Sequence, residues 1–155
     1  MLRRTYGVFL PLVCMAAFGV SSFAQTAKTI TIRMFDSKTA RPIANTTFMV
    51  RINHQQTVHV DWVQQNEDGS GKFTVPDGAT VASIHATYDQ STEIFVNCDS
   101  AREKQNPAEH WYSVSTILAS GIVAPNGCSK MTETAQPGEF VFFVRKLNLL
   151  EQMRD

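Results

Sequence analysis

The stretch Thr29–Met34 (TITIRM) alternates apolar and polar side chains along its whole length. A period of two residues is typical of a β-strand that is buried on one face only. The same alternation recurs in residues 47–52 (TFMVRI) and 57–62 (TVHVDW). Three alternating segments in succession favour a chain that is built mainly from strands.

Turn-forming residues separate these segments and mark where further strands begin. Asp36–Pro42 (DSKTARP) lies between the first two segments, and Asn66–Gly71 (NEDGSG) precedes the apolar–polar run 72–75 (KFTV). Asp, Gly, Ser, Asn and Pro dominate turns because they tolerate or preset the required backbone angles. Residues 80–86 and 92–98 follow the same strand pattern and are predicted as two more strands.

Residues 140–144 (FVFFV) are apolar at every position. A strand of this kind has no face for water and must be covered on both sides. We therefore expect it to lie in the centre of a sheet or beneath a helix.

One segment departs from the strand pattern and is predicted as a helix over about 107–119. Asn106 is a capping residue, Pro107 suits the first helical position and Glu109 suits the third. Trp111 begins a series of apolar residues at helical spacing, and Gly121 is placed to end the helix.

These segments together predict about seven short strands with turns between them. That pattern indicates a mainly β fold, a single antiparallel β-sandwich with one helix inserted before the last strand.

The first 24 residues have the three parts of a secretory signal peptide. Arg3 and Arg4 give a positive start, an apolar run covers residues 8–20, and Ser22-Phe23-Ala24 supplies the small residues of a cleavage site. The alternative is a membrane anchor, but a run of about 13 residues that contains Pro11 is shorter than the roughly 20 that a spanning helix needs. We expect cleavage after Ala24.

Cleavage leaves residues 25–155 as one domain. The whole chain has 14 basic and 14 acidic side chains, and loss of Arg3 and Arg4 leaves 12 against 14, a net charge of −2. Nucleic-acid-binding domains carry a basic excess, so no nucleic-acid partner is expected. The predicted location is the periplasm or the medium, with no stable membrane span after cleavage.

Cys98 and Cys128 are the two cysteines of residues 25–155. Two cysteines in an exported chain are most simply joined as a disulfide. A metal site or a catalytic thiol is the alternative. The cysteines lack the Cys-x-x-Cys spacing and no His lies within four residues of either one, which disfavours a metal site. The parity of residues 94–98 turns Cys98 inward, which suits a disulfide.

Three stretches of this sequence resemble parts of carboxypeptidase-regulatory-like (transthyretin-like) domains. Ile30–Asp36 and Lys38–Asn45 are similar to the opening of such domains, a strand, an Asp, a turn ending in Pro-Ile and a second strand. Asp68–Val75 is similar to their Asp-Gly-x-Gly-x-Phe turn into a strand. The resemblance covers residues 28–97 and implies a transthyretin-like or immunoglobulin-like sandwich, secretion and a non-catalytic adhesive or accessory role. It supplies no catalytic residue.

The later part of the chain departs from that family. Gly121–Cys128 (GIVAPNGC) and Pro137–Arg145 (PGEFVFFVR) resemble the tails of uncharacterised exported bacterial proteins. This second resemblance implies a location and no activity.

Candidate chemical groups are few. His59 and Asp61 share one face of a predicted strand, so an imidazole and a carboxylate are placed to form an acid–base pair or half a metal site. A polar pair on a solvated sheet is the simpler interpretation, because no third ligand has a suitable spacing. Tyr112 is the candidate for an exposed aromatic contact. We expect no catalytic residue, no metal and no cofactor.

Three hypotheses for function follow. The first is an exported non-enzymatic sandwich that binds a protein or an envelope component through loops or a sheet edge. The second is a small hydrolase or metal-binding protein that uses His59 and Asp61. The third is a purely structural component of the envelope. The missing nucleophile and metal motifs favour the first and third hypotheses, and the sequence does not separate those two.

Overall fold

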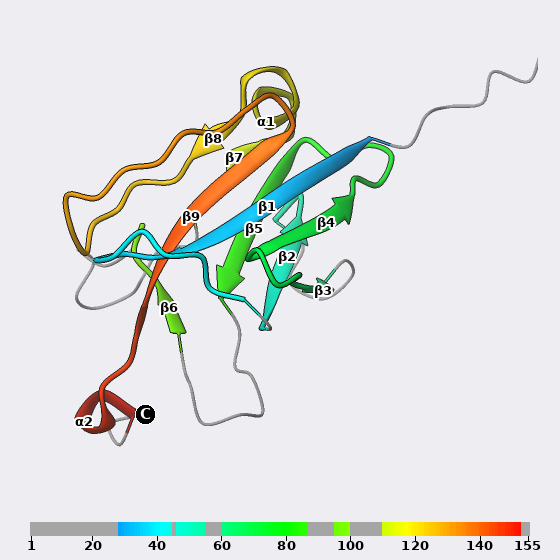
Figure 1. Ribbon diagram of the computed structural model, residues 1–155. Helices are drawn as coiled ribbons and strands as arrows, with labels where there is room; N and C mark the ends of the chain where they lie inside the picture. Colours follow the sequence, from blue (N-terminus) through cyan, green and yellow to red (C-terminus); the bar gives the residue numbers. More distant parts are fainter. Residues whose placement is uncertain (1–27, 45, 55–59, 87–94, 100–109, 153–155) are drawn as a thin grey trace, which may run out of the picture.

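A computed structural model describes residues 28–44, 46–54, 60–86, 95–99 and 110–152 (Figure 1). The described residues form two β-sheets, one helix of seven residues and one of four. The prediction of a mainly β chain is therefore confirmed.

The first sheet has β1 and β9 at its centre. The order of its strands is β4-β1-β9-β6, and β8 also pairs with β9. The strands are β1 (Thr29–Asp36), β4 (Ser70–Thr74), β6 (Phe95–Asn97), β8 (Ile122–Val123) and β9 (Glu139–Lys146).

The second sheet is antiparallel throughout, with the order β3-β2-β5-β7. Its strands are β2 (Thr47–Ile52), β3 (Val60–Gln64), β5 (Val81–Ala86) and β7 (Tyr112–Ser113). The long strands β1, β2 and β5 coincide with segments that the strand pattern predicts, and β9 contains the all-apolar run 140–144.

The main hydrophobic core lies between the two sheets. Alternate residues of β1, β2 and β9 are buried in it, as the period of two requires. Phe48 of the second sheet meets Phe142 of the first edge to face, with 6.1 Å between the ring centroids. Each fully buried side chain of this size contributes about 1.5–3 kcal/mol to folding.

The sheets approach each other closely at Gly71. A Cβ atom at this position would lie 2.8 Å from the Phe48 ring and 2.8 Å from Val63. The turn Asn66–Gly71, predicted from its composition, thus also supplies the small residue that the core needs beside Phe48.

The prediction of an antiparallel sandwich is wrong for two strand pairs. β1 and β8 both run parallel to β9, with Ile32 opposite Phe140 and Ile122 opposite Phe140 on the other side. Parallel neighbours need a long crossover connection, and the whole second sheet lies between β1 and β9 in the chain. Alternation within a strand does not report which way its neighbour runs.

The described residues contain nine strands, more than the seven predicted. The two additional strands, β7 and β8, have only two residues each, too few to show alternation. Of the predicted strand 92–98, residues 95–97 form β6, and residues 92–94 lie outside the described part.

The helix α1 (Val114–Ser120) begins later than predicted. Tyr112 and Ser113 pair with Ala82 and Val81 as β7, and the hydroxyl of Ser113 caps the helix by accepting from the Thr116 amide at 3.3 Å. The residues from which the earlier start was predicted, 106–109, lie outside the described part of the chain.

The end of α1 is as predicted. Gly121 adopts a φ of 74°, and a Cβ atom there would clash with the carbonyl oxygen of Gln136. Glycine alone tolerates both conditions.

The second helix, α2 (Leu149–Gln152), is fastened to the end of β9. Arg145 donates two hydrogen bonds to the Glu151 carboxylate, at 2.8 and 2.9 Å. The backbone amide of Asn148 donates to the Glu151 carboxylate at 3.0 Å, and the backbone amide of Glu151 donates to the Asn148 side-chain oxygen at 2.9 Å. The two residues therefore cap the start of α2 reciprocally.

Candidate functional site

The outer face of the first sheet carries a second, smaller hydrophobic cluster. Its buried members are Phe35, Cys98, Val141 and Phe143. Residues from the segment between α1 and β9 pack against it, among them Val123 and Cys128. This segment, residues 122–138, is called the cystine loop below. The loop covers the outer face of the apolar run 140–144 (FVFFV). This run was predicted to be covered on both sides, because it is apolar on both faces.

The predicted disulfide is present and fastens the cystine loop to the sheet. Cys98 and Cys128 are joined with 5.3 Å between their Cα atoms across a sequence separation of 30 residues. Cys98 is fully buried, but in the outer cluster and not between the two sheets. A cross-link that closes a loop of this length stabilises the fold by roughly 3–4 kcal/mol in the chain-entropy model.

Backbone hydrogen bonds reinforce the disulfide on both sides. The Cys98 amide donates to the Phe143 carbonyl at 2.9 Å, and the Gly127 amide donates to the Cys98 carbonyl at 2.9 Å. The Ala124 amide donates to the Val141 carbonyl at 2.8 Å. The start of the loop is therefore held to β9 through β8 and, beyond it, through Ala124.

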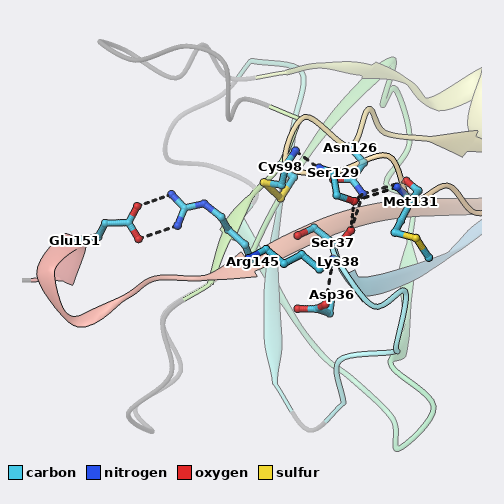
Figure 2. The surroundings of a disulfide bond; sticks show 10 residues. Asp36, Ser37, Lys38, Cys98, Asn126, Ser129, Met131, Arg145 and Glu151 are labelled. Atoms are coloured by element: carbon cyan, nitrogen blue, oxygen red, sulfur yellow. Dashed lines mark hydrogen bonds and ion pairs between the residues drawn. A yellow bond between two sulfur atoms is a disulfide. The ribbon is translucent and has the colours of Figure 1, made fainter.

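Asn126 is the second fastening of the loop. Its amide nitrogen lies 3.0 Å from each of three oxygens, those of the Ser37 carbonyl, the Ser129 hydroxyl and the Met131 carbonyl. Its amide oxygen accepts from the backbone amides of Cys128 and Ser129, at 3.3 and 3.2 Å. Figure 2 shows Asn126 and Ser129 reaching Ser37 with the cystine beside them.

Ser37 belongs to the turn after β1, which Asp36 holds in shape. One carboxylate oxygen of Asp36 accepts from the amides of Lys38 and Thr39 and from the Thr39 hydroxyl, at 2.8–3.1 Å. Burial alone would raise the pKa of Asp36, but these hydrogen bonds outweigh it and lower the pKa below its usual value. The turn that the sequence predicts at 36–42 is thus also the base on which the cystine loop rests.

A shallow cavity of about 250 Å³ opens within the cystine loop. Its apolar lining consists of Val123, Ala124, Pro125, Met131 and Phe143. Asn126, Ser129, Lys130 and Thr132 supply the polar lining.

The rim of the cavity is accessible. Met131 is 39% exposed, one of two large apolar side chains that are exposed among the described residues. Lys130, also exposed, brings a positive charge to the same rim. The arrangement is an apolar recess with polar and cationic groups at its edge, which suits binding of an apolar group.

The structure does not test the predicted pairing of His59 with Asp61. His59 lies outside the described residues. Asp61 is in β3, where its backbone is opposite Val50.

Tyr112 is not the exposed aromatic residue that we expected. Its ring packs on the main core with its centroid 4.7 Å from that of Phe140, and its hydroxyl donates to Asp99 at 2.8 Å. Burial, and then the negative charge of Asp99, raise the pKa of Tyr112 well above its usual value. The expectation failed because Tyr112 belongs to β7 and not to the surface of a helix.

Two further histidines lie in ordinary structural contacts. The ring of His54 is 4.2 Å from that of Trp111. His85 bonds to the Ser83 hydroxyl at 2.8 Å, as expected for a hydrogen-bonded residue of a sheet face.

Within the described ranges, no three His, Cys, Asp or Glu residues are grouped in a way that could hold a metal ion. In the same ranges no helix has both the length and the hydrophobicity to cross a membrane.

Sequence reasoning missed the cavity and the role of Asn126. Pro125-Asn126-Gly127 has the composition of a turn, and composition alone gives it no further role. The sequence feature that could have indicated the role of Asn126 is its position two residues before Cys128, since a cysteine in a disulfide must be held in place.

Comparison with known proteins found no matching family model, no matching curated protein and no matching solved structure.

Proposed function

We propose that this chain is an exported, non-catalytic binding or accessory module that works in the periplasm or outside the cell. It recognises a protein or an envelope component through the cystine loop. Its two sheets are proposed to form a β-sandwich of transthyretin-like type, the family that residues 28–97 resemble.

The observation that carries the proposal is the double fastening of an exposed loop. The cystine and the Asn126 hydrogen bonds hold the loop in one conformation around an apolar cavity. A loop that is already ordered loses little conformational entropy when a partner binds. Binding residues often lie on surface loops that a rigid scaffold holds in place.

The size of the cavity indicates what it accepts. A volume of about 250 Å³ is below the roughly 300–1,000 Å³ of pockets that enclose whole small molecules. It suits a single apolar side chain or a similar group, presented by a larger partner. Buried apolar anchors of this kind dominate the affinity of protein interfaces.

Export is supported by the signal-like first 24 residues and by the cystine, since disulfides persist in oxidising compartments. If export occurs with cleavage after Ala24, the isolated protein begins at Gln25. Its mass is then that of residues 25–155 less two hydrogens. A product that retains residues 1–24, or that has free Cys98 and Cys128, contradicts this part of the proposal.

The binding surface is tested by photo-crosslinking in the cell that makes the protein. A photoreactive amino acid at Thr132, in the lining of the cavity, is compared with the same group at Thr74. Thr74 is the matched control because it is also an exposed threonine but lies at the end of β4 and not in the lining of the cavity.

We expect a discrete cross-linked product from position 132 and none from position 74. Substitution Met131→Asp should reduce the yield about tenfold or more, because a charge at the rim disfavours burial of an apolar group. Equal labelling from both positions, or none from position 132, contradicts the proposal. The second result would favour a purely structural role in the envelope.

A further inference from the structure

Asn126-Gly127 is the one Asn-Gly sequence in the chain. Such pairs are chemically labile because glycine has no side chain to hinder attack by its own backbone nitrogen. The Gly127 nitrogen bonds to the Asn126 side-chain carbon while the bond from that carbon to the amide nitrogen breaks, and ammonia leaves. Water then opens the cyclic imide to aspartate or isoaspartate.

The folded loop blocks both partners of this reaction. The attacking nitrogen must lose its proton, but that proton is donated to the Cys98 carbonyl at 2.9 Å. The attacked side chain is held by contacts on both its oxygen and its nitrogen, all of them at 3.0–3.3 Å. Cyclisation therefore requires the loop to open first.

Opening is coupled to the cystine through the same few atoms. The Cys98 carbonyl, which holds the Gly127 amide, and Cys128, which follows Gly127, belong to the two bonded residues. Reduction by a dithiol converts the disulfide to two thiols while the dithiol becomes a disulfide. The cross-link that keeps Gly127 against Cys98 is then gone, and local opening becomes more frequent.

We propose that Asn126 is a deamidation site controlled by the Cys98–Cys128 cystine. The side chain is stable while the cystine is intact and reacts once the cystine is reduced. The site thereby records, irreversibly, that a chain has lost its disulfide. This inference rests on the geometry of the loop and is independent of the proposed binding function.

The modified chain cannot restore the native loop. A carboxylate at position 126 would place a negative oxygen where the amide nitrogen now lies 3.0 Å from the carbonyl oxygens of Ser37 and Met131. The Met131 carbonyl would then face a negative oxygen in place of a donor, and the Ser37 carbonyl would keep the Ser129 hydroxyl as its donor. The loss of a donor and the repulsion between acceptors are costly for groups that are partly buried. Isoaspartate would also lengthen the backbone at a point that the cystine requires to be fixed.

The test follows deamidation by peptide mapping during prolonged incubation at mildly alkaline pH. Three forms of the mature chain are compared: the oxidised protein, the protein reduced by a dithiol, and the oxidised Ser129→Ala variant. The readouts are the one-dalton mass gain of the peptide that contains Asn126 and labelling by an isoaspartyl methyltransferase. Asn66, followed by Glu67, is the internal control for general damage.

We expect the reduced chain to deamidate at Asn126 at least about tenfold faster than the oxidised chain, with Asn66 unchanged in both. Ser129→Ala retains the cystine but removes one partner of the Asn126 amide, so its rate should be intermediate. Circular dichroism of the reduced chain shows whether the sheets persist.

Two outcomes would overturn the proposal. The first is an oxidised chain that deamidates at Asn126 as fast as a short peptide of the same sequence. The second is a reduced chain that keeps Asn126 as long as the oxidised chain does. If reduction unfolds the whole chain, the Ser129→Ala comparison decides, because an unchanged rate in that variant would show that the side-chain contacts do not protect Asn126.

Discussion

Asn126 shows how one residue connects distant parts of the chain. It lies 89 residues from Ser37 in sequence, yet its amide bonds to the Ser37 carbonyl. The sequence Pro125-Asn126-Gly127 has the composition of a turn. It could not predict the three acceptors, since two of them belong to backbone carbonyls that only the folded chain brings near.

Substitution Asn126→Ala is expected to lower the free energy of unfolding by about 2–3 kcal/mol. The change removes several hydrogen bonds at once, including the one that the Asn126 amide donates to the Met131 carbonyl. Urea denaturation of the oxidised protein measures the loss. The matched control is Asn66→Ala in an exposed turn, which should cost less than about 1 kcal/mol. Equal effects of the two substitutions would contradict the role given to Asn126.

Tyr112 makes a prediction about alkaline pH. Its pKa is raised above the usual 10.0, by burial first and by Asp99 second, so the folded state retains a proton that the unfolded state loses. Stability must therefore fall as the pH rises above 10. The Tyr112→Phe variant has no such proton, and its stability should fall less over the same range.

Ultraviolet absorption of tyrosinate gives the direct measurement. The difference between the titrations of the wild type and of Tyr112→Phe should show no ionisation near pH 10 while the protein remains folded. A difference curve with an ordinary midpoint would place Tyr112 in water and remove it from the core beside Phe140.

At the scale of the elements, Asn97 closes one edge of the second sheet. Although it belongs to β6 of the first sheet, its side chain accepts from the Ala86 amide at 2.8 Å and donates to the Ile84 carbonyl at 2.7 Å. Asn97 thus bonds to the edge of β5 at Ile84 and Ala86, beyond the residues that pair with β7. Backbone amides and carbonyls that are left unpaired at a sheet edge bind readily to strands of other chains.

Substitution Asn97→Ala should therefore both destabilise the protein by about 1–3 kcal/mol and promote association through the edge of β5. Sedimentation at increasing concentration measures the association. Asn97→Asp is the informative companion, because its carboxylate still accepts from Ala86 but cannot donate to Ile84. An Ala variant that stays monomeric and as stable as the wild type would show that Asn97 does not protect this edge.

The elements themselves were predictable where local pattern determines them. Alternation identified β1 and β2, and the all-apolar run identified β9 as a covered strand. The parallel pairing of β1 with β9 was not predictable in this way, because it depends on the path of the chain through the second sheet. The start of α1 was missed for a similar reason, since pairing with β5 draws Tyr112 and Ser113 into a strand.

At the scale of the whole molecule, two sheets supply a stable base and the cystine loop supplies a shaped surface. The disulfide was predictable from two cysteines and an expected export signal. The cavity was not, because its lining combines β9, β8 and residues 124–132, which become neighbours only after the loop folds back. The predicted site at His59 and Asp61 remains a prediction, as His59 lies outside the described residues.

Hydrogen exchange of individual backbone amides tests most directly whether the cystine loop is a fixed surface. In the oxidised protein the amides of Ala124 and Gly127 should exchange slowly, because they donate to the Val141 and Cys98 carbonyls. After reduction the Gly127 amide should exchange much faster while the amides of β2 stay protected. Loop amides that exchange in the oxidised protein as fast as in an unfolded peptide would contradict the account.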